Sequence, residues 1–287
     1  MRLQLVVNPA AGGGRAAKLL PAVQAALGGH DLVVSPTRSL EHADELAAAA
    51  VADDRVVVAM GGDGIVGRVA GAVAAAGGVL GVVPGGRGND FCRSVGIPQD
   101  AVAACAVLTS GVETPVDLGY AGGVAFIGIA SVGFDSAVQE RVLRSRLPLG
   151  QLIYLYGSLV TVLSWKPATF RCEVDGAPVS VTGWSVAVAN SGMYGGGMKL
   201  APTASVTDGL LDVVSTSATS RLTFLRALPK VFKGTHVDEP SVTVRTASTV
   251  TLDADRPFRV FADGDPVATL PCQITVQPGA LRVLLPR

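Results

Sequence analysis

Short apolar runs alternate with longer alanine-rich stretches over the first third of the chain. Brief runs of Val, Leu and Ile are typical of buried strands, whereas longer stretches that mix alanine with polar residues favour helices. The pattern predicts strands at 3–7, 32–35, 56–60 and 79–83 and helices at 15–27, 41–52, 66–76 and 100–110, with Ser39 as a helix cap. Strands that alternate with helices in this way predict a doubly wound α/β domain around a parallel sheet.

From about residue 115 the pattern changes to short β-rich runs separated by Gly, Pro and Asp. We expect strands at 124–129, 169–174, 185–189, 211–214, 241–244 and 258–262, with helical segments at about 136–164 and 219–233. Asp175-Gly176 and Asp263-Gly264 are hairpin-turn dipeptides. The expected fold is therefore α/β plus β: a doubly wound domain at 1–114, a linker near 111–115, and an antiparallel β-sandwich-like domain at 115–275.

Composition and charge exclude several classes of function. Hydrophobic residues make up 49% of the 287 residues and charged residues 16%, which is ample for two buried cores. Lys plus Arg and Asp plus Glu both number 23, so the chain lacks the basic field that recruits nucleic acid. The four cysteines are widely spaced, which argues against a metal cluster. No apolar run is long enough to span a membrane or to act as a secretory signal, so we expect a cytoplasmic protein.

Three glycine-rich turns, at 8–15, 61–64 and 84–91, follow three of the predicted strands. A parallel sheet binds ligands at the carboxyl ends of its strands, and glycines let backbone N–H groups approach phosphate oxygens. Asp63 stands between glycines in the second turn, where a carboxylate suits the orientation of a nucleotide or its magnesium ion. The first turn alone is equally well read as a plain turn, but three in succession predict a phosphate-binding crevice.

The ordered set of motifs resembles the catalytic domain shared by diacylglycerol kinases, sphingosine and ceramide kinases and bacterial lipid kinases. The first half contributes the three turns. The second half contributes Asn190, Gly195-Gly196-Gly197, Lys199, Pro202, Ala204, the segment 208–212 and Asp263-Gly264-Asp265. The resemblance covers roughly residues 3–285. The Gly-Gly-Asp-Gly turn alone is shared with NAD kinases and phosphofructokinases.

The resemblance implies a Mg²⁺-dependent kinase that transfers the γ-phosphoryl group of ATP to a lipid hydroxyl, with diacylglycerol as the leading acceptor and a role in phospholipid biosynthesis. It also implies that the tail at 276–287 returns to the ATP-binding domain and that 115–275 receives the lipid. The expected ATP contacts are Asn8, Gly12, Gly13, Thr37, Gly61, Gly62, Asp63, Gly64, Gly86, Arg87, Gly88 and Asn89.

The resemblance places the general base on Asp263 or Asp265, although an Asp-Gly-Asp hairpin on the surface is the simpler structural alternative. It places a structural Mg²⁺ at Asp208, with Ser205 and Leu210 as carbonyl donors, where a plain turn is the alternative. Three positions depart from the family pattern, because Ile65, Arg68 and Arg87 replace its usual Thr, Glu and Thr. Arg87 can bind phosphate through its guanidinium, and Arg68 either does the same or is solvated.

Two further features complete the expectations. His30, His42 and His236 lack the neighbours that a triad or metal site needs, so we expect them at the surface. Basic and apolar residues mix at 141–165 and 221–233, which fits either docking on a membrane or ordinary amphipathic helices.

A small-molecule kinase similar to NAD kinase and a non-catalytic nucleotide-binding module remain as alternative functions, and a homodimer remains open.

Overall fold

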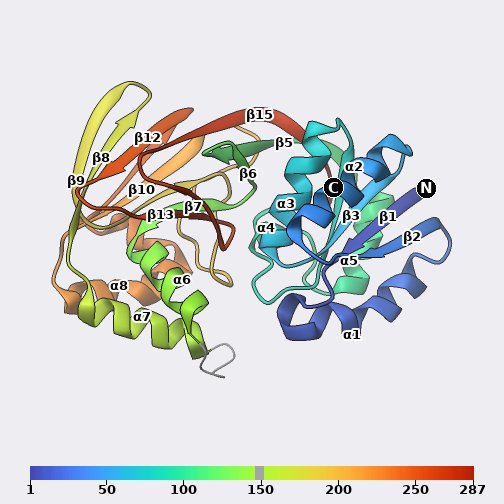
Figure 1. Ribbon diagram of the computed structural model, residues 1–287, viewed down its shortest axis with the longest axis horizontal. Helices are drawn as coiled ribbons and strands as arrows, with labels where there is room; N and C mark the ends of the chain where they lie inside the picture. Colours follow the sequence, from blue (N-terminus) through green and yellow to red (C-terminus); the bar gives the residue numbers. More distant parts are fainter. Residues whose placement is uncertain (146–151) are drawn as a thin grey trace.

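The computed structural model describes residues 1–145 and 152–287, without the side chains of Leu152 and Leu155. The chain forms two lobes joined side by side (Figure 1). In the first lobe a parallel sheet has the strand order β2-β1-β3-β4-β15. Its elements are β1 (Arg2–Val7), α1 (Ala11–Ala26), β2 (Asp31–Pro36), α2 (Leu40–Ala52), β3 (Val56–Gly61), α3 (Asp63–Ala75), β4 (Val79–Pro84), α4 (Asp90–Ser94) and α5 (Ala101–Ser110).

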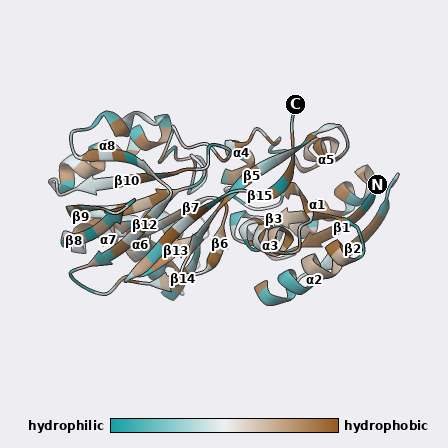
Figure 2. Ribbon diagram, turned by 90° about the horizontal axis from the view of Figure 1, so that it is seen from above, coloured by the Kyte–Doolittle hydropathy of each residue, from teal (hydrophilic) through white to brown (hydrophobic). Residues whose placement is uncertain are grey.

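Helices cover both faces of this sheet, α1 and α5 on one side and α2 and α3 on the other (Figure 2). The central strands are largely apolar because both of their faces are buried. Helix α2 begins where expected, since the Ser39 hydroxyl accepts a hydrogen bond from the His42 N–H at 3.1 Å. The doubly wound arrangement predicted from the alternation of elements is confirmed.

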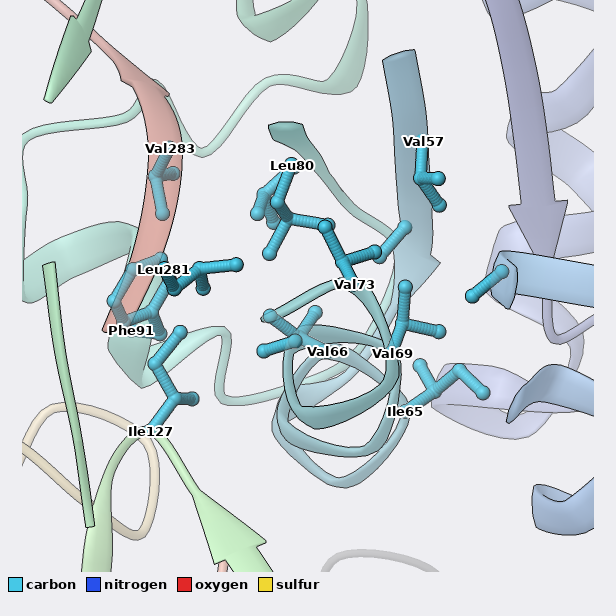
Figure 3. Close-up of a cluster of buried hydrophobic side chains, with 14 of the residues drawn as sticks. Val57, Ile65, Val66, Val69, Val73, Leu80, Phe91, Ile127, Leu281 and Val283 are labelled. Carbon is cyan, nitrogen blue, oxygen red and sulfur yellow. The ribbon is translucent and has the colours of Figure 1, made fainter. Parts of the chain in front are cut away.

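Helix α3 is fixed by one face of valines at helical spacing. Val66, Val69 and Val73 are at most 3% exposed, and burial of each valine side chain contributes about 1.5–3 kcal/mol. Figure 3 shows this face packed against side chains of β3, β4 and β15 together with Phe91 and Ile127. The helix that begins at Asp63 is therefore held rigidly against both the sheet and the start of the second lobe.

The second lobe is a largely antiparallel β structure with three helices along one edge (Figure 1). Its strands are β6 (Val124–Phe126), β7 (Ile129–Gly133), β8 (Ala168–Val174), β9 (Ala177–Ala189), β10 (Leu211–Ser217), β11 (Val242–Ala247), β12 (Thr249–Ala254), β13 (Arg259–Ala262) and β14 (Asp265–Thr269). The helices are α6 (Phe134–Arg144), α7 (Leu152–Ser164), α8 (Arg221–Lys233) and the 3₁₀ turn η1 (Thr235–Asp238). The sandwich-like second domain expected from the sequence is confirmed.

Two long strands connect the lobes. Strand β5 (Val112–Ala121) pairs along its length with β15 (Cys272–Leu285), and β15 pairs with β12 in the second lobe and with β4 in the first. The residues near 111–115, where the sequence suggested a linker, are the C-cap of α5 and the first residues of β5. A β ladder that crosses the boundary restrains the two lobes more tightly than a flexible segment does.

Most predicted elements are present, with local differences. The strand expected at 124–129 is broken into β6 and β7. Both Asp-Gly hairpins are confirmed, since Asp175 and Asp263 adopt φ values of 47° and 51° ahead of their glycines. Among the described residues, no helix is long and apolar enough to cross a bilayer. All four cysteines are buried and free.

Candidate active site

The three glycine-rich turns pack directly on one another. The Gly61 carbonyl accepts hydrogen bonds from the N–H groups of Gly85 and Gly86 at 2.8 and 2.9 Å. A Cβ on Gly12, which has φ 64°, would lie 2.9 Å from the Gly85 carbonyl oxygen, so no larger residue fits this approach. Arg15 Nη1 donates to the Gly86 carbonyl oxygen at 3.0 Å. The turns therefore form one surface of closely spaced backbone at the carboxyl edge of the sheet, as predicted.

Asp63 and Asp90 place two carboxylates beside these turns. Asp63 Oδ1 accepts a hydrogen bond from the Phe91 N–H at 3.0 Å, which ties the start of α3 to the start of α4. Burial raises the pKa of both carboxyls, and the charge of Asp90 raises the pKa of Asp63 further. Both side chains approach Gly88, where a Cβ would lie 2.9 Å from an Asp90 oxygen and 3.1 Å from an Asp63 oxygen.

A single cleft of about 940 Å³ joins the turns to the second lobe. Its first half is lined by backbone and carboxylates from the turns. Its second half is walled mainly by apolar side chains from the second lobe, and these are Phe134, Val138, Met193, Met198, Leu200, Phe224, Leu228, Val231 and Val242. The cleft thus pairs a polar, phosphate-sized surface with an apolar cavity.

Asp263 reaches the cleft from the β13–β14 hairpin. Its carboxylate accepts hydrogen bonds from the backbone N–H groups of Ile127, Gly128 and Ile129 at 2.9, 2.9 and 3.2 Å. Burial raises its pKa to about 7, although the three N–H donors act in the opposite direction. A carboxyl with a pKa near neutrality, held rigidly in a cleft, has the properties of a general base.

Asp265 lies nearby on the same hairpin, against the first turn of α3. A Cβ on Gly64 would lie 2.8 Å from Asp265 Oδ2, so glycine at this position admits the carboxylate. Burial raises the pKa of Asp265, and the positive charge of Arg68 partly offsets this. Both acidic residues of the Asp-Gly-Asp motif therefore line the cleft.

The predicted ATP contacts divide into residues that line the cleft and residues that support it. Those in the lining are Asn8, Gly12, Gly13, Gly62, Asp63, Gly64, Gly86, Arg87 and Gly88. Gly61 and Asn89 are not in the lining, but they shape the third turn, since Asn89 Oδ1 accepts a hydrogen bond from the Gly86 N–H at 2.9 Å. Thr37 lies outside the lining and donates its backbone N–H to the Val7 carbonyl at 2.8 Å.

The structure gives each departure from the family pattern a different explanation. Ile65 is 4% exposed and its side chain fills the space above Gly61. Where the family has a threonine hydroxyl, this chain therefore has an apolar packing contact. Arg68 is partly exposed and is engaged by Asp44, because its Nε donates to both carboxylate oxygens of Asp44 at 2.9 and 2.8 Å. Arg87 lies over Gly13 in the cleft, and none of the hydrogen bonds or ion pairs of the described residues uses its guanidinium.

The segment predicted to hold Mg²⁺ lies away from the cleft lining. Asp208 is exposed, and its Oδ1 accepts a hydrogen bond from the Leu210 N–H at 3.0 Å, while the Ser205 and Thr207 hydroxyls lie 3.2 Å apart. Burial raises the pKa of the Asp212 carboxyl, and the charge of Asp208 raises it further. No cluster of three or more Asp, Glu, His or Cys side chains suited to a metal occurs in the described ranges. The oxygen donors present are nevertheless of the kind that Mg²⁺ takes.

Sequence reasoning missed several residues in the cleft. Asp135 and Tyr194 line its apolar half, and the Tyr194 hydroxyl donates to Asp135 Oδ1 at 3.4 Å. His236, expected at the surface, is 4% exposed and also lines the cleft. Asp135 follows a strand and a glycine at the start of a helix, as Asp63 does, so the same pattern of strand, glycine and acid was the available signal.

Comparison with known proteins agrees with this geometry. Residues 2–121 match the profile described as the diacylglycerol kinase catalytic domain, and residues 128–285 match the YegS C-terminal NAD kinase beta sandwich-like domain. A diacylglycerol kinase of Mycobacterium tuberculosis strain CDC 1551 is 35% identical over 100% of this chain and 96% of its own length. The chain belongs to the diacylglycerol kinase family of lipid kinases.

Other members of the family are similar to this chain at lower identity. A diacylglycerol kinase of Bacillus subtilis strain 168 is 28% identical over 83% of this chain and 80% of its own length. The crystal structure of a diacylglycerol kinase from Bacillus anthracis strain Sterne superposes with a TM-score of 0.74 at 21% identity, covering 99% of this chain and 96% of that one. This last likeness concerns the fold. As a member of the family, the chain is a lipid kinase, and the kinase family implies ATP as phosphate donor.

Proposed function

We propose that the protein transfers the γ-phosphoryl group of Mg-ATP to the hydroxyl of a lipid, with diacylglycerol as the leading acceptor. The observation that carries this proposal is the single cleft in which a surface of glycine-rich turns continues into an apolar cavity. Backbone N–H groups and a guanidinium suit a polyphosphate, whereas an apolar wall suits an acyl chain. A small polar acceptor such as a dinucleotide does not need that wall.

The two acidic residues of the hairpin have the chemistry that the transfer requires. Asp263 removes the proton of the lipid hydroxyl while the hydroxyl oxygen attacks the γ-phosphorus and ADP leaves. Its near-neutral pKa and its fixed backbone contacts support this assignment over Asp265. Arg87 and the N–H groups of the turns stabilise the charge on the phosphoryl oxygens.

Magnesium enters the proposal in two places. The ion bound to ATP comes with the substrate, and Asp63 and Asp90 supply the carboxylates near the phosphates that such an ion uses. A structural Mg²⁺ at Asp208 would draw on Ser205 and Leu210 for further oxygens. That ion would order the loop ahead of β10, at a distance from the reacting atoms.

A membrane surface is the natural source of the acceptor. Exposed apolar residues on α7 and α8 that do not line the cleft are Tyr156, Leu159, Leu163, Leu222 and Phe232, and basic residues on α8 are Arg221, Arg226, Lys230 and Lys233. Other residues of the same two helices line the cleft. Apolar burial combined with attraction to anionic lipid is sufficient for interfacial binding, which supports a cytoplasmic protein that docks peripherally.

ADP release from Mg-ATP tests the proposal, measured without acceptor, with diacylglycerol in mixed micelles, and with NAD. We expect release that depends on diacylglycerol and is abolished in Asp63→Asn, which keeps the oxygen that faces the Phe91 N–H. Release with NAD alone would support the small-molecule kinase. ATP binding without release in any mixture would support a non-catalytic module.

A further inference from the structure

An incompletely satisfied carboxylate lies in the acceptor half of the cleft. Asp135 lies in the first turn of α6, shortly after β7, and lines the cavity. Its printed partner is the Tyr194 hydroxyl at 3.4 Å, which is a long hydrogen bond, and the Ser185 hydroxyl also interacts with it. None of the ion pairs in the described part of the chain involves Asp135.

The cost of partly burying this carboxylate is not fully offset by the donors that the protein itself supplies. A carboxylate offers about four acceptor positions, and two hydroxyls leave part of that capacity unused. Burial raises the pKa of Asp135 to about 6, which reflects this cost. The positive end of α6 offsets part of it. A half-buried carboxylate that faces a ligand cavity with spare acceptor capacity is a binding group for a hydrogen-bond donor on the ligand.

His236 gives an independent observation of the same kind. Its Nε2 lies 3.0 Å from the Leu200 carbonyl oxygen, and because a carbonyl only accepts, Nε2 carries the proton. The neutral ring then has an acceptor at Nδ1, which is buried and has no hydrogen-bond partner. Burial lowers the pKa of His236 and so favours this neutral form. The acceptor half of the cleft therefore contains a second residue with an unused hydrogen-bond acceptor.

The carboxyl–phenol pair lies where the two halves of the cleft meet. Tyr194 directly precedes the glycines whose N–H groups bind Asp90, beside the phosphate turns. The pKa of Tyr194 is raised by burial first, then by the charge of Asp135, and also by that of Asp90. The part of a lipid that lies at this junction is its headgroup, next to the hydroxyl that reacts.

We propose that Asp135, oriented by Tyr194, accepts a hydrogen bond from a second free hydroxyl on the headgroup of the acceptor lipid. This inference rests on the proposed lipid kinase function and extends it. Diacylglycerol has one hydroxyl, which is consumed in the reaction, so the Asp135 site adds a further class of acceptor: lipids whose glycerol headgroup carries two free hydroxyls. Asp135 acts here as a specificity-determining residue, separate from the Asp263 base.

Two acceptors that differ by one hydroxyl test the proposal. 1-Oleoylglycerol has two free hydroxyls, and the oleoyl monoester of 1,3-propanediol lacks the middle one while keeping the acyl chain. We expect the wild-type kcat/KM to favour 1-oleoylglycerol by about 10- to 100-fold, as for a hydrogen bond to a charged group. Asp135→Ala should reduce this ratio to about 1. Asp135→Asn, which keeps a carbonyl acceptor, should retain part of it.

Controls separate this outcome from general damage. Asp253→Ala removes an acidic residue that pairs with Arg171 outside the cleft, and it should leave the ratio unchanged. Two outcomes would overturn the inference: an Asp135→Ala protein whose kcat/KM falls by the same factor on both acceptors, or a wild-type protein that shows no preference between them. In either case, ADP release that depends on diacylglycerol would still support the kinase function. If no lipid, diacylglycerol included, supports release, the proposed function and the inference both fail.

Discussion

Asp90 accepts a hydrogen bond from the backbone N–H of Gly197 at 2.6 Å, and this contact joins the two lobes across the cleft. The neighbouring Gly196 N–H donates to the same carboxylate at 2.8 Å. Gly196 and Gly197 both have positive φ values, 89° and 105°, which bring successive N–H groups to one side of the loop. The third phosphate turn of the first lobe is thus tied to a loop that borders the acceptor half.

Replacing Asp90 should loosen this connection. We expect Asp90→Ala to lower kcat by about tenfold or more, because the phosphate turns and the acceptor cavity lose their fixed relation and small displacements are costly in phosphoryl transfer. Steady-state kinetics and thermal unfolding check the result together. Asp100→Ala, which removes a helix cap in the same lobe, is the matched control for loss of stability. Unchanged kcat in Asp90→Ala would show that the contact does not position the lobes.

The Asp263 assignment is tested by separate Asp263→Asn and Asp265→Asn proteins at saturating ATP and lipid. We expect Asp263→Asn to lower kcat by about 10²-fold or more, since a positioned general base contributes that much. Asp265→Asn should have a smaller effect, because the carboxylate of Asp265 lacks the three backbone contacts that fix Asp263. If Asp265→Asn lowers kcat more than Asp263→Asn does, the roles of the two residues are reversed.

The pH dependence of kcat/KM follows from the same carboxyl group. The pKa of Asp263 is raised to about 7, and only the unprotonated form accepts a proton. Activity should therefore fall about tenfold per pH unit below 7 and level off above it. The break near pH 7 should persist in Asp265→Asn. A wild-type profile that is flat between pH 5 and 8 would contradict the assignment.

Arg87 and Arg68 make a matched pair of cations with different expected roles. Arg87→Ala should raise the KM for ATP by about tenfold or more, because an unpaired guanidinium in the cleft contributes a charge-assisted contact to phosphate. Arg68→Ala removes an ion pair with Asp44 and should leave the KM for ATP within about twofold, since this pair is partly exposed and weak. ATP-dependent initial rates at fixed lipid distinguish them.

The docking surface on α7 and α8 predicts binding that depends on lipid charge and salt. Arg226 and Lys233 enter none of the ion pairs of the described residues, and each basic group near an anionic surface contributes about 1 kcal/mol. The double variant Arg226→Glu, Lys233→Glu should lower co-sedimentation with anionic vesicles by about tenfold or more. Lys18→Glu on α1 is the control for charge alone. Wild-type binding to vesicles that does not change with salt or with the content of anionic lipid would exclude this surface. Arg146, which the sequence also predicted for the docking surface, lies outside the described ranges.

The sequence by itself determined the features that depend on local pattern. Apolar runs followed by glycine-rich turns predicted β1, β3 and β4, because a buried parallel strand and a glycine-rich turn each have a distinct composition. Asp-Gly predicted the hairpin that carries Asp263, because that dipeptide favours the left-handed backbone of a tight turn. The order of these motifs also indicated the family.

Only the tertiary structure decided which distant residues meet. The pKa of Asp263, about 7, reflects burial of its carboxyl group, opposed by N–H donors from Ile127 to Ile129, which lie more than a hundred positions earlier in the chain. The pairing of Arg68 with Asp44 and the approach of Asp90 to Gly197 likewise join separate elements. Asp135 has the same local pattern as Asp63, but its place in the acceptor cavity depends on how α6 packs against the second lobe. Local composition sets the backbone of each turn, whereas burial and partners, which fix charge and reactivity, arise only when the lobes pack together.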